Sequence, residues 1–370
     1  MYARNCIHYI RFFRKKTNGR KADQMNIIFT TLAAILIFAV LVFIHELGHF
    51  IAAKLSGVKV NEFAIGMGPK LFGKQKGETL YSVRLIPIGG FCAMEGEDEN
   101  TTDERALNNK KPYIRLIILV AGAFMNILLG FILIFSLTIG TAETVVPKVN
   151  SVTEGGAAEA AGLQDNDVIL RANGKRVHII EDLSWAMSNN SRENKELQLE
   201  VKNGGEKRTV SIVPETSNGK SSYGILLKTE QNGLFQTLRN SWYKTGFYSG
   251  VIIDSFISMI KGDIPISQIS GPVGIVSEIG NVVEETRTTG WEGFQSLLAL
   301  TILLTINLGV FNLFPIPALD GGRILFVLIE MVRRKPVPVE KEAIVHFAGF
   351  VLLIAFSIFI AFKDVFMLWG

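Results

Sequence analysis

The sequence predicts a polytopic α-helical membrane protein with four transmembrane helices, a membrane-associated β-hairpin and one extracytoplasmic α+β domain. Three observations support this fold class. Hydrophobic residues make up 48% of the 370 residues and gather in continuous runs of membrane-spanning length. A glycine-rich, strand-like region follows the first run, and a long polar region with its own strand and turn signals lies between the second and the third.

Charge and cysteine content exclude several functions. The formal net charge is only +4 and the basic residues are dispersed, so nothing indicates nucleic-acid binding. Cys6 and Cys92 are the only cysteines, and the chain therefore has neither a disulfide framework nor a cysteine-based metal site. A zinc site would have to use histidine and carboxylate ligands.

The basic segment at residues 1–24 has two interpretations. It is either a cytoplasmic anchor or an extension from an upstream start, because Met25 stands directly before the first apolar run. We expect the second, since the basic residues oppose the membrane orientation derived below. The segment does not resemble a cleavable signal peptide, because the apolar run after it carries a polar motif and lacks a small-x-small exit.

The first span, from about Asn26 to Leu55, carries a motif that is unfavourable to bury. The span is longer than the ~20 residues that a bilayer requires, so the motif lies toward one face of the membrane. His45 and His49 share one face of a helix and can bind one Zn²⁺, while Glu46 can take a proton from water at the metal. The alternative is a pair of packed histidines with Glu46 as an incidental partner.

A polar region from Ser56 to Tyr113 follows, and its glycines separate short strand-like pieces. Residues 86–91 are apolar and contain Gly89 and Gly90, which suits a β-hairpin that dips back toward the bilayer. An ordinary surface hairpin fits the same residues. The expected strands are 58–63, 81–85 and 91–94.

The second span covers about Ile114 to Thr141. Gly122 and Ala123 are small enough for close packing against another helix. Asn126 is a polar residue in the middle of this apolar helix. It is either an interhelical hydrogen-bonding residue or a support for the metal site.

From about Glu143 to Lys228 the composition is that of a soluble α+β domain. A strand, a short helix of small residues, a Gly-Leu stop, an Asp-x-Ile strand and an Asn-Gly turn follow one another, and a later hairpin turns at residues 203–205. This order resembles a PDZ domain of the bacterial type, and such domains hold extended peptides by strand addition at a sheet edge. Another small α+β module is the alternative.

The third span begins near Gln295 and ends at a predicted break. Before it, residues 233–262 are amphipathic and contain Asp254, so we expect an interfacial helix there. After Phe314, two prolines and a Gly-Gly pair should interrupt the helix, which is tolerated at membrane depth only inside protein or beside a water-filled cavity. Asp320 at this break is the expected third metal ligand. Its alternative role is an N-cap for the helix from Gly321 onward.

The fourth span, about Ile344 to Phe362, sets the orientation together with the loops. His346 near its start is expected to be a packed or interfacial histidine and not a ligand. The loops after the first and third spans are rich in lysine and arginine, so both should face the cytoplasm. The metal site then lies toward the cytoplasmic side of the cell membrane, and the PDZ-like domain is extracytoplasmic.

The chain is therefore expected to have five parts. These are a basic N-terminal tail or upstream extension (1–24), the first and second transmembrane helices with a cytoplasmic β-rich loop (25–141), a PDZ-like domain (142–228), an amphipathic connector (229–294), and the third and fourth transmembrane helices (295–370).

Two separated motifs resemble those of the site-2 proteases. The first is the H-E-x-x-H motif at residues 45–49, and the second is the N-x-x-P-x-P-x-L-D-G-G motif at residues 312–322. More narrowly, the chain resembles the bacterial RseP-like intramembrane zinc metalloproteases with one PDZ domain, from about Met25 to the C-terminus. The Ser-Gly-Pro segment at 270–272 belongs to this resemblance. Ala123 departs from it, because many relatives have proline there.

The resemblance implies a role for each site residue. His45, His49 and Asp320 would hold Zn²⁺, and Glu46 would be the catalytic general base. Asn312 would bind the substrate backbone. The hairpin with its Gly-Gly pair would receive an unwound substrate by strand addition, because a helical substrate protects its amides. The substrate-binding residues implied are thus Asn312, Gly89 and Gly90.

The substrates implied are single-pass membrane proteins or membrane-bound peptides, such as anti-sigma factors or signal-peptide remnants. They would be cut in or near the bilayer. The PDZ-like domain would screen them without taking part in the chemistry.

Two functions from other classes remain open. A metal transporter would use His45, His49 and Asp320 as a transit site, but transporters usually show repeats and several polar groups along a path. A membrane scaffold would recruit partners through the PDZ-like domain and keep a vestigial metal site, but the intact Glu46 argues against it. A Glu46→Gln variant separates the three, because it should abolish cleavage and leave metal binding and recruitment largely in place.

Overall fold

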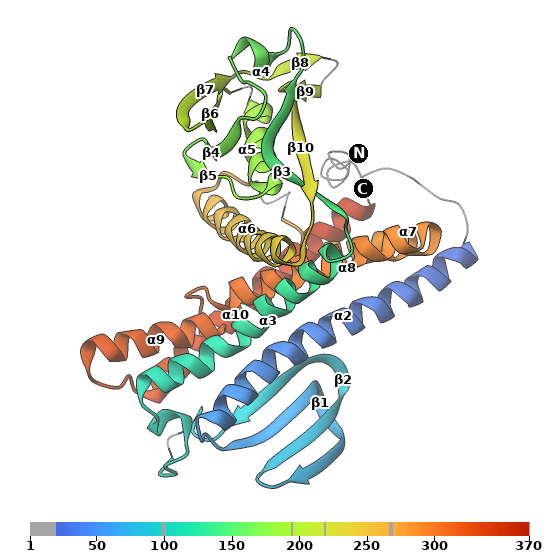
Figure 1. Ribbon diagram of the computed structural model, residues 1–370. Coiled ribbons are helices and arrows are strands. Elements are labelled where there is room, and N and C mark those ends of the chain that lie inside the picture. The colour runs from blue at the N-terminus through green and yellow to red at the C-terminus, as the bar shows by residue number, and fades with distance from the viewer. Residues whose placement is uncertain are drawn as a thin grey trace.

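Four apolar helices form the centre of the molecule. The computed structural model describes residues 20–97, 99, 101–193, 195–217, 220–265 and 269–369, so most of the tail at 1–24, with Cys6, lies outside the described residues. Four of the described helices are long and apolar enough to cross a membrane, which confirms the expected four spans. They are α2 (Arg20–Leu55), α3 (Pro112–Thr138), α8 (Trp291–Asn312) and α10 (Val339–Trp369) (Figure 1).

Proline marks where two of these elements begin or end. α3 begins at Pro112, a position where the missing N–H would have had no acceptor within the helix. α8 ends at Asn312, two residues before the end expected from the sequence. Pro315 and Pro317 then stop the helix, and α9 (Asp320–Arg333) begins after this break.

Glycines bring the helices close to α3, which packs against α2, α8, α9 and the helix α6 (Leu234–Lys261). A Cβ on Gly48 of α2 would lie 2.3 Å from the carbonyl oxygen of Ala121. A Cβ on Gly309 of α8 would lie 2.8 Å from the carbonyl oxygen of Ala123. Both distances are too short for a side chain, so these glycines set the separation of the helices.

The region after α2 forms a curved sheet from β1 (Val60–Lys76) and β2 (Thr79–Met94). The three expected strands overlap paired segments of this sheet, but a fourth segment was missed: 62–65 contact both 90–93 and 80–83, and 72–76 contact 79–83. The segment missed was 70–76, whose lysines and glycine show no apolar alternation. The order across the sheet is 90–94, 60–65, 79–83 and 70–76, which leaves 90–94 at one edge.

This curved sheet and a second sheet lie at opposite ends of the helices (Figure 1). The curved sheet precedes α3, with a single turn η1 (Leu107–Asn109) between them, and the second sheet follows α3. Because α3 is long enough to cross a bilayer, the two sheets are separated by its full length.

The second sheet has strand order β10-β3-β4-β6-β7, with β5 paired to β4. Its core contains the fully buried side chains of Leu183, Leu197 and Leu199. The last strand extends three residues past the boundary expected at 228. The elements of the domain that contains this sheet are β3 (Glu143–Val152), α4 (Ala157–Ala160), β4 (Val168–Ala172), β5 (Lys175–Arg176), α5 (Ile180–Glu193), β6 (Leu197–Asn203), β7 (Glu206–Ile212), β8 (Glu215–Ser217), β9 (Lys220–Ser222) and β10 (Ile225–Gln231). β8 and β9 pair with each other in a separate two-stranded sheet.

This sheet domain rests on the amphipathic helix α6 (Leu234–Lys261), which is not among the candidate spans of the described residues. Lys244 of α6 pairs with Glu181 at 2.8 Å. The His178 ring stacks on Tyr243 with centroids 4.3 Å apart. The remaining connector, α7 (Pro272–Thr289), packs against α2, α8 and α10.

We predict that Gly309→Ala lowers the stability of the helix bundle by about 1–3 kcal/mol, because its Cβ would press on the Ala123 carbonyl. Gly246→Ala is the matched control, since a Cβ on this α6 residue meets nothing within 4 Å. Unfolding by SDS in detergent micelles measures both. Equal midpoints for the two variants would contradict the close packing.

Candidate metal centre

Three side chains from two distant parts of the chain meet between α2 and α9. His45 Nε2 lies 3.0 Å from Asp320 Oδ2, and His49 Nε2 lies 3.2 Å from the same oxygen. The two Nε2 atoms are 3.3 Å apart. Among the described residues, this trio is the group of histidine, cysteine and acidic side chains that could hold a metal ion.

The three atoms are spaced nearly as on one face of a zinc coordination tetrahedron, with the shortest separation, 3.0 Å, somewhat below the ideal range. At Zn–ligand distances of about 2.0–2.2 Å, two ligand atoms of a tetrahedral site are about 3.3–3.6 Å apart. Asp320 Oδ2 is buried and accepts no hydrogen bond from the described residues, so a cation would satisfy it. Two imidazoles and a carboxylate are also a common catalytic zinc set, with the fourth position open.

Asp320 is the first helical residue of α9 and not its N-cap. The N-cap residue is Leu319, which makes no side-chain capping bond. The alternative role of Asp320 as a helix cap was therefore wrong. The carboxylate instead points at the histidine pair.

The other nitrogen of each imidazole is held by α3. His49 Nδ1 donates to the Ile118 carbonyl oxygen at 2.8 Å, which leaves Nε2 free to ligate. His45 Nδ1 lies 3.3 Å from the amide of Asn126. Asn126 Oδ1 has no partner among the described residues, and an amide turned by 180° would let it accept from His45 Nδ1–H. This contact places the Asn126 amide beside the His45 ring.

Gly122 allows α3 to pass directly beneath the histidines. A Cβ on this residue would lie 2.3 Å from His49 Nε2 and 2.8 Å from His45 Cε1. The sequence indicated Gly122 only as a packing residue. Its contact with both rings depends on how α2 and α3 cross, which the helical pattern of either one does not contain.

Glu46 lies on the side of the trio that faces the curved sheet. A Cβ on Gly90 would be 3.6 Å from Glu46 Cγ and 2.8 Å from the Ala64 carbonyl oxygen. Gly90 begins the edge segment 90–94, and the neighbouring Gly89 has a positive φ of +88°. The structure thus brings Gly90 beside Glu46, with Gly89 next to it. The outer edge of this segment has no strand partner among the described residues.

Asn312 completes the cluster from the end of α8. Its Nδ2 lies 3.5 Å from His45 Nε2. An amide at this place can hydrogen-bond a polar group held at the open position. His346, in contrast, lies outside the trio, as expected.

Ion pairs hold α9, which carries Asp320, in place. Arg115 of α3 pairs with Glu330 at 2.7 Å, and both side chains are largely buried. Arg323 of α9 pairs with Glu97, which follows the curved sheet. These two ion pairs connect α9 to α3 and to the segment that follows the curved sheet.

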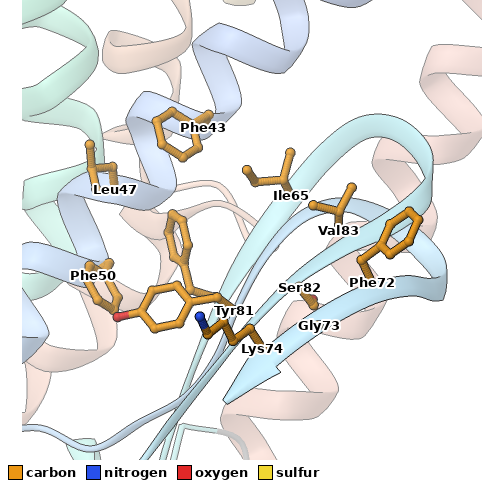
Figure 2. A pocket seen from close by; sticks show the side chains of 11 residues that line it. Phe43, Leu47, Phe50, Ile65, Phe72, Gly73, Lys74, Tyr81, Ser82 and Val83 are labelled. Atoms are coloured by element: carbon orange, nitrogen blue, oxygen red, sulfur yellow. The ribbon is translucent and has the colours of Figure 1, made fainter. Parts of the chain in front are cut away.

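An apolar groove lies between α2 and the curved sheet, with a volume of about 580 Å³. Phe43, Leu47 and Phe50 of α2 line this groove together with Tyr81 and Val83 of the sheet (Figure 2). These α2 residues flank Glu46 in the sequence. The groove is lined mainly by apolar side chains and can therefore take an apolar side chain.

A histidine pair, a carboxylate ligand and an adjacent glutamate, held between apolar helices, define the class of membrane metallopeptidases. The sequence model of peptidase family M50 matches residues 33–356. The chain belongs to this family, and it is an enzyme.

Its relatives are similar along nearly their whole length. A protein of Clostridium perfringens, named as a zinc metalloprotease by inference, is 36% identical over 349 residues, which cover 92% of this chain and 98% of that protein. The zinc metalloprotease RasP of Oceanobacillus iheyensis is 31% identical, with 91% and 98% covered. The regulator of sigma-W protease RasP of Bacillus subtilis is 28% identical, with the same coverage.

We predict that Gly122→Ala strongly weakens zinc retention, by about 10–100-fold, because its methyl group displaces both imidazoles. Gly250→Ala, whose Cβ meets nothing within 4 Å, should retain zinc like the unchanged chain. Zinc bound after dialysis against a graded chelator series measures this. Equal retention by the two variants would show that Gly122 does not contact the ligands.

Proposed function

We propose that this chain is an intramembrane zinc metalloprotease that hydrolyses peptide bonds in or near transmembrane segments of membrane proteins. The observation that carries the proposal is the convergence of His45, His49 and Asp320 within 3.0–3.3 Å of one another, between helices long enough to span a bilayer. The zinc named for the relatives fits this donor set.

Each residue of the site has a distinct task. His45, His49 and Asp320 would hold the zinc ion, which when bound would supply Lewis-acid chemistry for the scissile carbonyl and for the attacking water. The Glu46 carboxylate accepts the proton of the attacking water and then delivers it to the leaving amine. Asn312 donates a hydrogen bond to the substrate backbone, and Asn126 keeps the His45 ring in its orientation.

Substrate binding requires an unwound segment, because helical amides and carbonyls are already hydrogen-bonded. The edge segment 90–94 offers replacement partners by strand addition beside Glu46. Gly89 and Gly90 let the substrate backbone approach closely. The apolar groove at Phe43 and Phe50 accommodates an apolar side chain of the same segment.

The two sheets act on opposite sides of the cell membrane. The lysine- and arginine-rich loops support an orientation with the curved sheet and the metal site toward the cytoplasm. The sheet domain at 143–231 is then extracytoplasmic, and as a PDZ-like module it screens substrates that have been shortened outside. The substrates are single-pass membrane proteins or membrane-bound peptides, with anti-sigma factors and signal-peptide remnants as the classes to test.

We predict that Glu46→Gln lowers cleavage by about 10²–10⁴-fold and leaves zinc content unchanged, because the amide cannot accept the proton of water. The control is Glu78→Gln, an acidic residue between β1 and β2 and not among the potential ligands. Membrane peptides from cells that express each form are compared, and fragments absent only from Glu46→Gln identify substrates and cut sites. Undiminished cleavage by Glu46→Gln would refute the proposal, and zinc transport without any cleavage would favour a transporter.

A further inference from the structure

A histidine on the last helix contacts the break that precedes Asp320. His346 lies near the start of α10, and its Nδ1 is 3.0 Å from the backbone nitrogen of Ala318. A backbone N–H can only donate, so Nδ1 accepts this hydrogen bond and the ring proton resides on Nε2. Nε2 lies 4.0 Å from Glu342 Oε1, a distance longer than a hydrogen bond.

This hydrogen bond completes the backbone pairing of the break. Residues 313–319 contain two prolines, and five N–H groups remain. Those of Leu313, Phe314, Ile316 and Leu319 donate to carbonyl oxygens within residues 310–316. The N–H of Ala318 alone depends on a side chain from another helix. Within a membrane protein, a buried N–H without an acceptor is strongly unfavourable. His346 therefore supplies the acceptor that a backbone carbonyl would supply in a helix unbroken by proline.

The conformation of Ala318 adds to this dependence. Its φ is +76°, a left-handed value that residues with a Cβ rarely adopt and that persists only where surrounding contacts hold it. Asp320 follows two residues later. A relaxed Ala318 would therefore change the direction from which Asp320 approaches the two histidines.

α10 approaches the break closely at the same place. A Cβ on Gly349, one helical turn after His346, would lie 2.3 Å from Pro317 Cβ. A Cβ on Gly322 of α9 would lie 3.1 Å from His346 Cε1. The Phe326 ring of α9 packs with its centroid 5.8 Å from that of His346. His346 is thus enclosed by the break and by the first turns of α9.

We propose that His346 is a positioning residue for the metal site. It accepts the Ala318 N–H, holds the left-handed turn before α9 and so directs the Asp320 carboxylate at His45 and His49. It touches neither substrate nor the reacting atoms. The inference rests on the proposed function of the metal site and assigns the last transmembrane helix a part in it.

Two substitutions separate the hydrogen bond from simple packing. His346→Asn keeps an acceptor oxygen at the place of Nδ1, whereas His346→Leu fills similar space and has no acceptor. Phe347→Leu is the matched control, because Phe347 is the next residue of α10 and is 69% exposed. Each full-length variant is purified in detergent with zinc.

We expect His346→Leu to bind zinc about 10–100-fold more weakly in chelator competition. Amide hydrogen exchange at Ala318 should be faster in this variant, and cleavage should fall. His346→Asn should restore protection of Ala318 and bring zinc affinity within about threefold of the unchanged chain. Phe347→Leu should match the unchanged chain in all three measurements.

Three results would overturn the inference. The first is unchanged Ala318 exchange and zinc affinity in His346→Leu. The second is a defect in His346→Asn as large as that in His346→Leu, because a packing role gives no advantage to the acceptor. The third is an equal defect in Phe347→Leu. Failure of the proposed function looks different, since the unchanged chain would then fail to cleave while zinc affinity still depended on residue 346.

Discussion

The metal site depends on the break in the chain between α8 and α9. An unbroken continuation of α8 would carry Asp320 past the histidines of α2, whereas the break at Pro315 and Pro317 turns the chain and starts α9 with the carboxylate pointing at them. In a membrane every exposed backbone N–H must find an acceptor inside the protein. The loop meets this constraint with its own carbonyls and with His346.

Close packing of α3 at Gly122 determines how the imidazoles of His45 and His49 are positioned. α3 passes beneath His45 and His49 at Gly122, and the Ile118 carbonyl and the Asn126 amide reach the second nitrogen of each ring. The same helix therefore sets both the position and the orientation of the imidazoles. A bulkier α3 would leave the rings without either support, because second-sphere hydrogen bonds act only at contact distance.

The layout around this site keeps the two sheets apart. The curved sheet brings its edge segment up to Glu46 at one end of the helices, while the sheet domain contacts α6 at the other end. Membership of peptidase family M50 agrees with a hydrolytic use of such a site. The length of α3 sets the distance between the two regions.

Local pattern was enough to predict the apolar spans, the shared helix face of His45 and His49, and the break near Pro315, because the information for each lies within a few residues. The paired segment 70–76 could not be predicted, because its lysines interrupt the alternation of apolar residues that marks a strand. Its pairing depends on residues 79–83, which lie beside it only in the folded sheet. The contacts of Gly122, Asn126 and His346 were decided by tertiary structure alone. They depend on how separate helices cross, and no periodicity within one helix records that angle.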